Sequence, residues 1–202
     1  MAAKASRHIH RVVVTTDDPG IARIARKYGA ETPFLRPAAL ASDTVSMNEV
    51  VLHCLEELKR RERYQPDYFA LLQPTCPLRT SRQIDEAIEL ALRHRSEAVI
   101  SVCPVTTHPY LMKKIENGRL KNAFPGTTIG RRQDLPPLYQ LNGSIYILPT
   151  SVFLRKKNMH RLSSVPYLMP ARDSVDIDTI DDFLYAEWLM QNASTDERSD
   201  GQ

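Results

Sequence analysis

Residues 68–83 read Tyr-Phe-Ala-Leu-Leu-Gln-Pro-Thr-Cys-Pro-Leu-Arg-Thr-Ser-Arg-Gln, and this stretch decides the fold. The apolar run at its start is typical of a buried strand. The Thr-Ser-Arg-Gln segment at its end is a capping box, which predicts a helix directly afterwards. A buried strand, a short polar loop and a helix together form the repeating unit of an α/β fold.

The same alternation continues on both sides of this unit. The β-branched run at residues 11–16 and the apolar run at 98–103 predict further buried strands, and 144–148 predicts another. We expect one helix to open at Asp43 or Thr44 and the last helix to open near Thr179. Strands too apolar to face water on either side favour a mainly parallel sheet between two layers of helices. We therefore predict a single α/β domain over residues 1–191, with a disordered polar tail at 192–202.

A different pattern interrupts the chain after Cys103. Residues 110–115 and 119–121 are two short strand-like runs around Asn117-Gly118, the dipeptide that most strongly indicates a two-residue hairpin turn. The hairpin falls between two predicted sheet strands. We therefore predict that it protrudes as an arm, within a region of about 108–137.

Composition excludes several function classes. The net charge of +3 over 202 residues is small, and most basic residues share helices with acidic ones, so we expect no nucleic-acid partner. Cys54, Cys76 and Cys103 are too far apart for a zinc motif and fit a reducing compartment, so we predict a cytoplasmic protein. No apolar run is long enough to span a bilayer, and the polar start is unlike a signal peptide, so we expect no membrane partner.

The segment 174–179, Ser-Val-Asp-Ile-Asp-Thr, carries the strongest local signal for chemistry. Residues two apart on an extended backbone point to the same side, so Asp176 and Asp178 would face one point. Such a pair at the end of a strand can hold a divalent cation that binds phosphate oxygens. Asp-x-Asp is also a common sequence. The alternative is that one aspartate caps the last helix while the other is solvated.

Two loops carry further candidates. Gln73, Thr75 and Arg79 follow a buried strand, the place where open α/β sheets bind ligands; alternatively, this is only a rigid turn with Arg79 on the surface. Arg131 and Arg132 have the planar fork that suits carboxylate or phosphate groups; alternatively, they belong to an exposed basic loop without a ligand.

Seven motifs, taken in order, resemble those of the acylneuraminate cytidylyltransferases, also called CMP-sialic acid synthetases. They are Val-Val-Thr-Thr-Asp-Asp at 13–18, Phe-Leu-Arg-Pro at 34–37, Ala-Ser-Asp-Thr at 41–44, Leu-Gln-Pro-Thr-Cys-Pro-Leu-Arg at 72–79, Arg-Arg-Gln-Asp-Leu-Pro at 131–136, Asn-Gly-Ser-Ile-Tyr at 142–146 and Val-Asp-Ile-Asp-Thr at 175–179. The resemblance implies a Rossmann-like three-layer sandwich whose arm contacts a second copy in a homodimer. It also implies transfer of CMP from CTP to an acidic nine-carbon sugar, with Mg²⁺ as cofactor and pyrophosphate as the second product.

The resemblance also implies roles for individual residues. It makes Asp176 and Asp178 the magnesium ligands, and with Arg132 the catalytic residues. The sugar-binding positions it implies are Gln73, Thr75, Arg79, Arg131, Arg132, Gln133, Asn142 and Tyr146. The nucleotide-binding positions are Arg36, Asp43 and Ser46. Cys76 stands where the family more often has serine, a change that leaves the backbone geometry intact.

The chain departs from the family pattern at its start. Family members begin with a strand and a loop reading roughly Pro-Ala-Arg-Gly-Gly-Ser-Lys-Gly, whose backbone N–H groups cradle the triphosphate. Residues 1–10 contain no such loop. We therefore expect weak activity from this chain by itself, and a catalytically silent, sugar-binding or dimerising protein is the alternative. A nucleotide-sugar glycosyltransferase is a weaker alternative, because Asp-x-Asp also occurs in that class.

Overall fold

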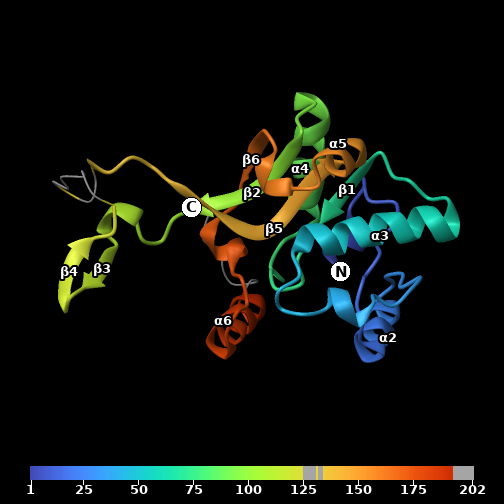
Figure 1. Cartoon of the computed structure of the whole chain (residues 1–202), viewed down its shortest axis with the longest axis horizontal. Helices are drawn as coiled ribbons and strands as arrows, with labels where there is room; N and C mark the ends of the chain where they lie inside the picture. Colours follow the sequence, from blue (N-terminus) through green and yellow to red (C-terminus); the bar gives the residue numbers. More distant parts are fainter. Residues whose placement is uncertain (125–130, 132–133, 193–202) are drawn as a thin grey trace.

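The computed structural model describes residues 1–124, 131 and 134–192. A four-stranded sheet of order β1-β5-β2-β6 forms the centre of this part of the chain (Figure 1). The strands are β1 (Tyr68–Leu71), β2 (Ala98–Pro104), β5 (Tyr139–Pro149) and β6 (Ser164–Leu168). β5 is antiparallel to both β1 and β2, whereas β6 is parallel to β2. Three of these strands therefore run in one direction, and the reversed β5 makes the sheet mixed.

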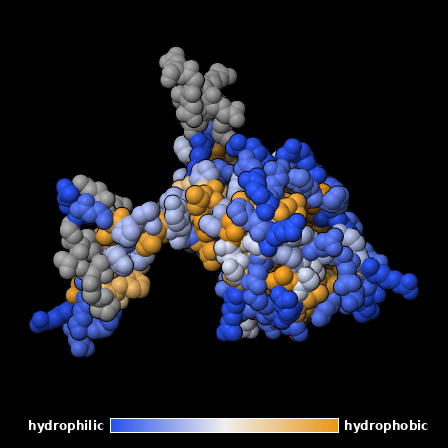
Figure 2. All heavy atoms as spheres, turned by 90° about the horizontal axis from the view of Figure 1, so that it is seen from above, coloured by the Kyte–Doolittle hydropathy of each residue, from blue (hydrophilic) through white to orange (hydrophobic). Residues whose placement is uncertain are grey.

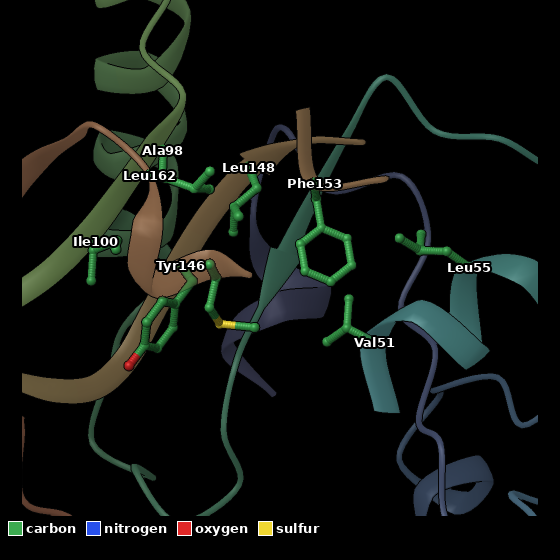
Figure 3. Packing of buried hydrophobic residues seen from close by; sticks show 9 residues of the cluster. Val51, Leu55, Ala98, Ile100, Tyr146, Leu148, Phe153 and Leu162 are labelled. Carbon is green, nitrogen blue, oxygen red and sulfur yellow. The ribbon is translucent and has the colours of Figure 1, made fainter. Parts of the chain in front are cut away.

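Helices cover both faces of the sheet, which confirms the predicted α/β sandwich. Alternate residues of β2 enter opposite cores: Ala98 and Ile100 pack with α3 (Met47–Glu62) and α5 (Thr150–Lys156), as Figure 3 shows. Val99 points to the other side and packs against α4 (Ser81–His94). Both faces are buried, which explains why the strand reads as a continuous apolar run rather than an alternating one.

The remaining elements are short or lie around this sandwich. They are the helices α1 (Ala2–Ala5), α2 (Pro19–Lys27) and α6 (Ile180–Gln191), the 3₁₀ turns η1 (Ala38–Leu40), η2 (Pro109–Leu111), η4 (Met159–Arg161) and η5 (Ala171–Ser174), and the strands β3 (Lys113–Glu116) and β4 (Arg119–Asn122). Among the helices of the described residues, none has the length and apolar character needed to cross a bilayer.

Helix starts follow the capping chemistry. α4 begins after Thr80, whose side chain accepts from the backbone N–H of Gln83, as predicted. α3 begins at Met47 rather than at Asp43 or Thr44, so that prediction is wrong. Its N-cap is Ser46, which exchanges hydrogen bonds with Glu49 and lowers the pKa of that carboxyl group. A complete capping box outweighs isolated residues of N-cap type.

The predicted strand at residues 11–16 does not join the central sheet within the described residues, and that prediction is wrong. Its backbone pairs instead with the segment after α2: Val14 N donates to Glu31 O, and Glu31 N donates to Val12 O, both at 2.8 Å. Arg11 reinforces this pairing through ion pairs with Glu31 and Glu62. A β-branched run indicates extended backbone but cannot identify its partner.

A β-hairpin stands at the predicted place after β2. β3 and β4 pair around Asn117 and Gly118, both with positive φ. Figure 2 shows this part of the chain standing away from the body of the molecule. Ile115 and Leu120 face each other across the hairpin and are 76% and 73% exposed. We call residues 113–122 the arm; its predicted role in dimerisation stays a prediction.

Candidate functional site

Three segments meet at one edge of the sheet, beyond the carboxyl ends of β1, β2 and β6. They are the loop 73–79 after β1, the start of β5, and the segment 170–178 after β6. Ile177 N donates to Thr75 O at 2.9 Å, so the last segment crosses the sheet edge from β6 to reach the loop after β1. This edge is where open α/β sheets bind ligands.

Gly143 lies at the point where these segments converge. Its φ is +70°, and a Cβ atom there would lie 2.6 Å from Gln73 Oε1, 3.2 Å from Cys76 Sγ and 3.5 Å from Asp176 Oδ2. Any side chain at this position would therefore collide with Gln73 and carry left-handed backbone strain. We refer to Gln73, Cys76, Gly143 and Asp176 as the edge cluster.

Cys76 is the buried member of the edge cluster. Its Sγ donates to Asn142 O at 3.2 Å and lies 3.5 Å from Asp176 Oδ1. Burial, and then the nearby Asp176 carboxylate, raise the pKa of the thiol to about 11. The neutral thiol is therefore a weak hydrogen-bond donor to the backbone of Asn142, and not a nucleophile.

The side chain of Arg79 holds the loop 73–79 in place. Its guanidinium donates to three backbone carbonyls, those of Gln73 at 2.6 Å, Cys76 at 2.7 Å and Ser144 at 3.2 Å. Partial burial lowers the pKa of this guanidinium. The sequence left two alternatives for Arg79, a contact with a ligand or a position on the surface. In the structure its guanidinium joins the loop 73–79 to β5.

Asn142 is likewise part of the framework, with only 3% of its surface exposed. Its Nδ2 donates to Ser174 Oγ at 2.8 Å, and its Oδ1 accepts from Ser101 Oγ at 2.5 Å and from Ser144 N at 3.2 Å. Ser101 is not among the residues predicted for the site, and Ser174 entered that prediction only as the first residue of the segment 174–179. The available signal was a serine inside the otherwise apolar run of β2, a residue that needs a buried partner.

Asp176 and Asp178 lie on the exposed side of their segment, and Ile177 between them is half-buried. The alternative that one of them caps the last helix is wrong. Thr179 is the N-cap of α6, and Asp182 accepts from the backbone N–H groups of Thr179 and Asp178. Both aspartate side chains are therefore outside the capping box.

The donor set at the edge fits a magnesium ion that also binds substrate phosphates. No group of three or more His, Cys, Asp or Glu residues that could hold a metal occurs in the part of the chain described here. Mg²⁺ does not require such a group, because it is usually held by one or two carboxylates together with waters and phosphate oxygens. Asp176 and Asp178 could supply those carboxylates.

The other predicted site residues lie in varied surroundings. Arg131 is exposed and pairs with Asp134, while Arg132 and Gln133 lie outside the described residues. Tyr146 is 5% exposed and packs in the core of Figure 3; burial first, and Cys76 and Asp176 next, raise its pKa.

The three predicted nucleotide-binding residues lie before or at the start of α3. Arg36 is half-buried, and its Nη2 lies 3.5 Å from Asp17 Oδ1. Asp43 is exposed, and the side chain of Ser46 is engaged in the cap of α3.

Comparison with known sequences identifies the family. A family model described as Cytidylyltransferase matches residues 1–193. The CMP-N,N'-diacetyllegionaminic acid synthase of Legionella pneumophila is 33% identical over 195 residues, which cover 95% of this chain and 82% of that protein. The N-acylneuraminate cytidylyltransferase of Escherichia coli is 31% identical over 191 residues, covering 94% of this chain and 44% of the longer relative.

Comparison with solved structures supports the fold. A CMP:2-keto-3-deoxy-manno-octonic acid synthetase complexed with CTP aligns with a TM-score of 0.67 at 14% identity, covering 95% of this chain and 85% of that one. A 4-diphosphocytidyl-2C-methyl-D-erythritol synthase aligns with a TM-score of 0.65 at 13% identity, covering 94% and 85%. The family match over almost the whole chain and the α/β sandwich agree, and this chain belongs to the cytidylyltransferase family of nucleotidyltransferases.

Proposed function

We propose that this protein transfers CMP from CTP to an acidic nine-carbon sugar of the sialic or legionaminic acid type. One observation supports this most: the bond between Ile177 N and Thr75 O brings the Asp176 carboxylate to the sheet edge beside Gln73. Asp176, which could hold a magnesium ion bound to phosphate, and Gln73, whose neutral amide could bind the sugar, therefore lie in one site. Relatives named for legionaminic and sialic acids supply the substrate class.

The reaction joins the two substrates at phosphorus. The anomeric hydroxyl oxygen of the sugar attacks the α-phosphorus of CTP and forms a new P–O bond. The bond from the α-phosphorus to the bridging oxygen breaks, the pyrophosphate leaves with that electron pair, and the hydroxyl proton passes to solvent or to phosphate. The electrostatic demand is greatest on the phosphate oxygens, where negative charge builds up as the leaving group departs.

Asp176 and Asp178 would hold a magnesium ion in this scheme. Such an ion, when bound, neutralises charge on the triphosphate and helps pyrophosphate to leave. The Asp176 carboxylate lies 3.5 Å from the Cys76 thiol, within the edge cluster. Asp178 follows on the same side of the extended segment.

The sugar and the base would occupy the two sides of this centre. Gln73 and Thr75 would face the sugar from the loop after β1. Asn142 and Tyr146, the sugar-binding positions that the resemblance implies on β5, are buried and would support this side of the site from beneath. Arg131, Arg132 and Gln133 would meet the sugar carboxylate, for which a guanidinium fork is the preferred partner. Arg36, Asp43 and Ser46 would hold the nucleotide, and Arg79 would keep the loop carrying Gln73 in place.

Homodimerisation through the arm completes the proposal. A two-stranded hairpin cannot bury Ile115 and Leu120 by itself, and their exposure on a projecting element is what an interface requires. A second copy is the partner that the family resemblance implies. Three unpaired cysteines fit a cytoplasmic setting.

The test is pyrophosphate release by the purified protein with CTP, Mg²⁺ and either N-acetylneuraminate or a legionaminic acid. We expect release that requires all three components and a CMP-sugar product of matching mass. Sugar binding without any release of pyrophosphate would instead identify a catalytically silent protein. Pyrophosphate release without a CMP-sugar product would reject the proposed acceptor.

A further inference from the structure

The pairing between β2 and β5 is interrupted directly beneath the edge cluster. Ile100 pairs with Tyr146 and Val102 pairs with Leu141, so residues 142–145 of β5 stand opposite the single residue Ser101. Extra residues on one strand form a bulge that leaves backbone groups without their usual ladder partners. Gly143, with φ of +70°, belongs to this bulge and is also the member of the edge cluster that Gln73, Cys76 and Asp176 approach.

The side chain of Ser101 replaces the missing ladder bonds. Ser101 is fully buried, and its Oγ accepts from Ile145 N at 2.8 Å. The same hydroxyl donates to Asn142 Oδ1 at 2.5 Å. One hydroxyl group therefore fixes both ends of the bulge, because its single donor and one of its acceptor positions are used on either side of Gly143.

Asn142 carries the connection onward to the carboxylate segment. Its Nδ2 donates to Ser174 Oγ at 2.8 Å, and Ser174 Oγ in turn donates to Pro170 O at 2.8 Å. The hydrogen bonds run in one consistent direction from Ile145 N to Pro170 O. They link the central strand β2 to η5, which ends two residues before Asp176.

We propose that Ser101 is a positioning residue for the reaction: through the Asn142 amide it sets the position of the Gly143 bulge and of the segment that carries Asp176. This inference rests on the proposed function for its catalytic consequence. Loss of the hydroxyl would leave Ile145 N without its buried acceptor and would remove the shorter of the two hydrogen bonds that hold Asn142 Oδ1. Asp176 would then lose its fixed place beside Gln73, and a group misplaced by a fraction of an ångström acts poorly on a transition state.

Two substitutions cut this connection at opposite ends, and the bulge itself provides a matched control. Ser101→Ala removes the first link, and Ser174→Ala removes the last link from a half-buried position. Ser144→Ala removes another fully buried hydroxyl of the same bulge, which has no hydrogen-bond partner. Ser144→Ala therefore shows how far the removal of a hydroxyl from this bulge affects the protein when no hydrogen bond is lost.

The first measurement is turnover as a function of the sugar concentration at saturating Mg²⁺ and CTP. We expect Ser101→Ala and Ser174→Ala each to lower kcat by roughly tenfold or more, with a smaller change in the KM for the sugar. We expect the kcat of the double variant to resemble that of the less active single variant. The two serines do not touch each other, but both changes interrupt the same series of hydrogen bonds. Ser144→Ala should keep the activity of the unaltered protein. Additive losses, or equal losses in Ser144→Ala, would overturn the proposal.

The second measurement needs no catalysis. Amide hydrogen exchange at Ile177, whose N–H is bonded to Thr75 O, reports whether the carboxylate segment is held. We expect faster exchange there in Ser101→Ala and Ser174→Ala and unchanged exchange in Ser144→Ala. Unchanged exchange in the first two would overturn the positioning role. If exchange at Ile177 responds as expected while the unaltered protein transfers no CMP, the proposed function is wrong, but the effect of Ser101 on the position of the Asp176 segment is confirmed. Should Ser101→Ala fail to fold, Ser174→Ala decides the matter.

Discussion

The backbone N–H of Ile177 donates to the carbonyl of Thr75 at 2.9 Å, across a sequence separation that spans most of the sheet. This bond joins the two stretches that carry the strongest chemical signals in the sequence. Ile177 itself is half-buried, whereas Asp176 and Asp178 on either side of it are exposed. Gln73 and Cys76 approach Asp176 over Gly143.

Asp176→Asn and Asp178→Asn should each abolish magnesium-dependent binding of CTP while leaving the fold intact. Both side chains are exposed, so the loss of charge costs little packing, but an amide is a poor magnesium ligand. Isothermal titration with CTP in the presence and absence of Mg²⁺ measures the effect. Asp181→Asn, in the exposed first turn of α6, is the control and should bind as the unaltered protein does. Unchanged metal dependence in both site variants would refute the assignment.

Gly143→Ala should impair catalysis much more than stability alone explains. Its left-handed backbone would cost about 1–2 kcal/mol with any side chain, and its Cβ would also lie 2.6 Å from Gln73 Oε1. Gly118→Ala is the matched control, because Gly118 has the same φ of +70° with nothing within 4 Å of a new Cβ. Thermal unfolding should show similar losses in both variants. Only Gly143→Ala should lose kcat, by roughly tenfold or more for a displaced catalytic group; equal activity in the two would contradict the crowding argument.

Much of this arrangement was predictable from local sequence, and the rest depends on long-range pairing. The apolar run before Gln73 and the capping box after Arg79 identified their strand and helix, since both signals are local. The spacing of Asp176 and Asp178 agrees with the exposure of both residues around the half-buried Ile177, and their joint role stays a prediction. The bulge at Gly143 was not predictable, because it arises from the register between β2 and β5, which no local pattern specifies.

The failures have equally specific causes. Residues 11–16 have a strand-like composition, yet they pair with Glu31 rather than with the central sheet. The sequence around α3 offers several residues of N-cap type, and only Ser46 has a glutamate three residues later. For Arg79 the sequence leaves two alternatives, a ligand-binding cation or a surface residue, because it cannot show that the guanidinium donates to three backbone carbonyls.

Arg79→Lys should loosen the loop 73–79 although the positive charge is kept. An ammonium group cannot reproduce the planar fork that reaches three carbonyls in different directions. We expect a loss of about 1–3 kcal/mol in the free energy of unfolding, since buried carbonyls lose charged donors, and a lower kcat/KM for the sugar. Chemical denaturation and steady-state kinetics measure the two effects. Arg82→Lys, on the exposed side of α4, is the control; equal behaviour of the two lysine variants would exclude a special role for Arg79.

Ile115→Glu combined with Leu120→Lys should convert a dimer into a monomer. The two side chains face each other on the arm, so opposite charges keep the hairpin paired while removing its apolar contact surface. Light scattering coupled to size-exclusion chromatography gives the mass. Leu92→Ser, an equally simple change at an exposed apolar residue of α4, is the control and should leave the mass unchanged. A dimer that survives the arm substitutions does not use the arm as its interface.

The most direct measurement is sugar-dependent release of pyrophosphate by the protein produced from its complete gene, assayed beside its Asp176→Asn variant. The account predicts release only when CTP, Mg²⁺ and an acidic nine-carbon sugar are all present, formation of the CMP-sugar, and a loss of at least a hundredfold, on the order expected for a removed electrostatic contact, in the variant. Equal turnover by the variant, or no transfer of CMP to any acidic nine-carbon sugar by the unaltered protein, would contradict it.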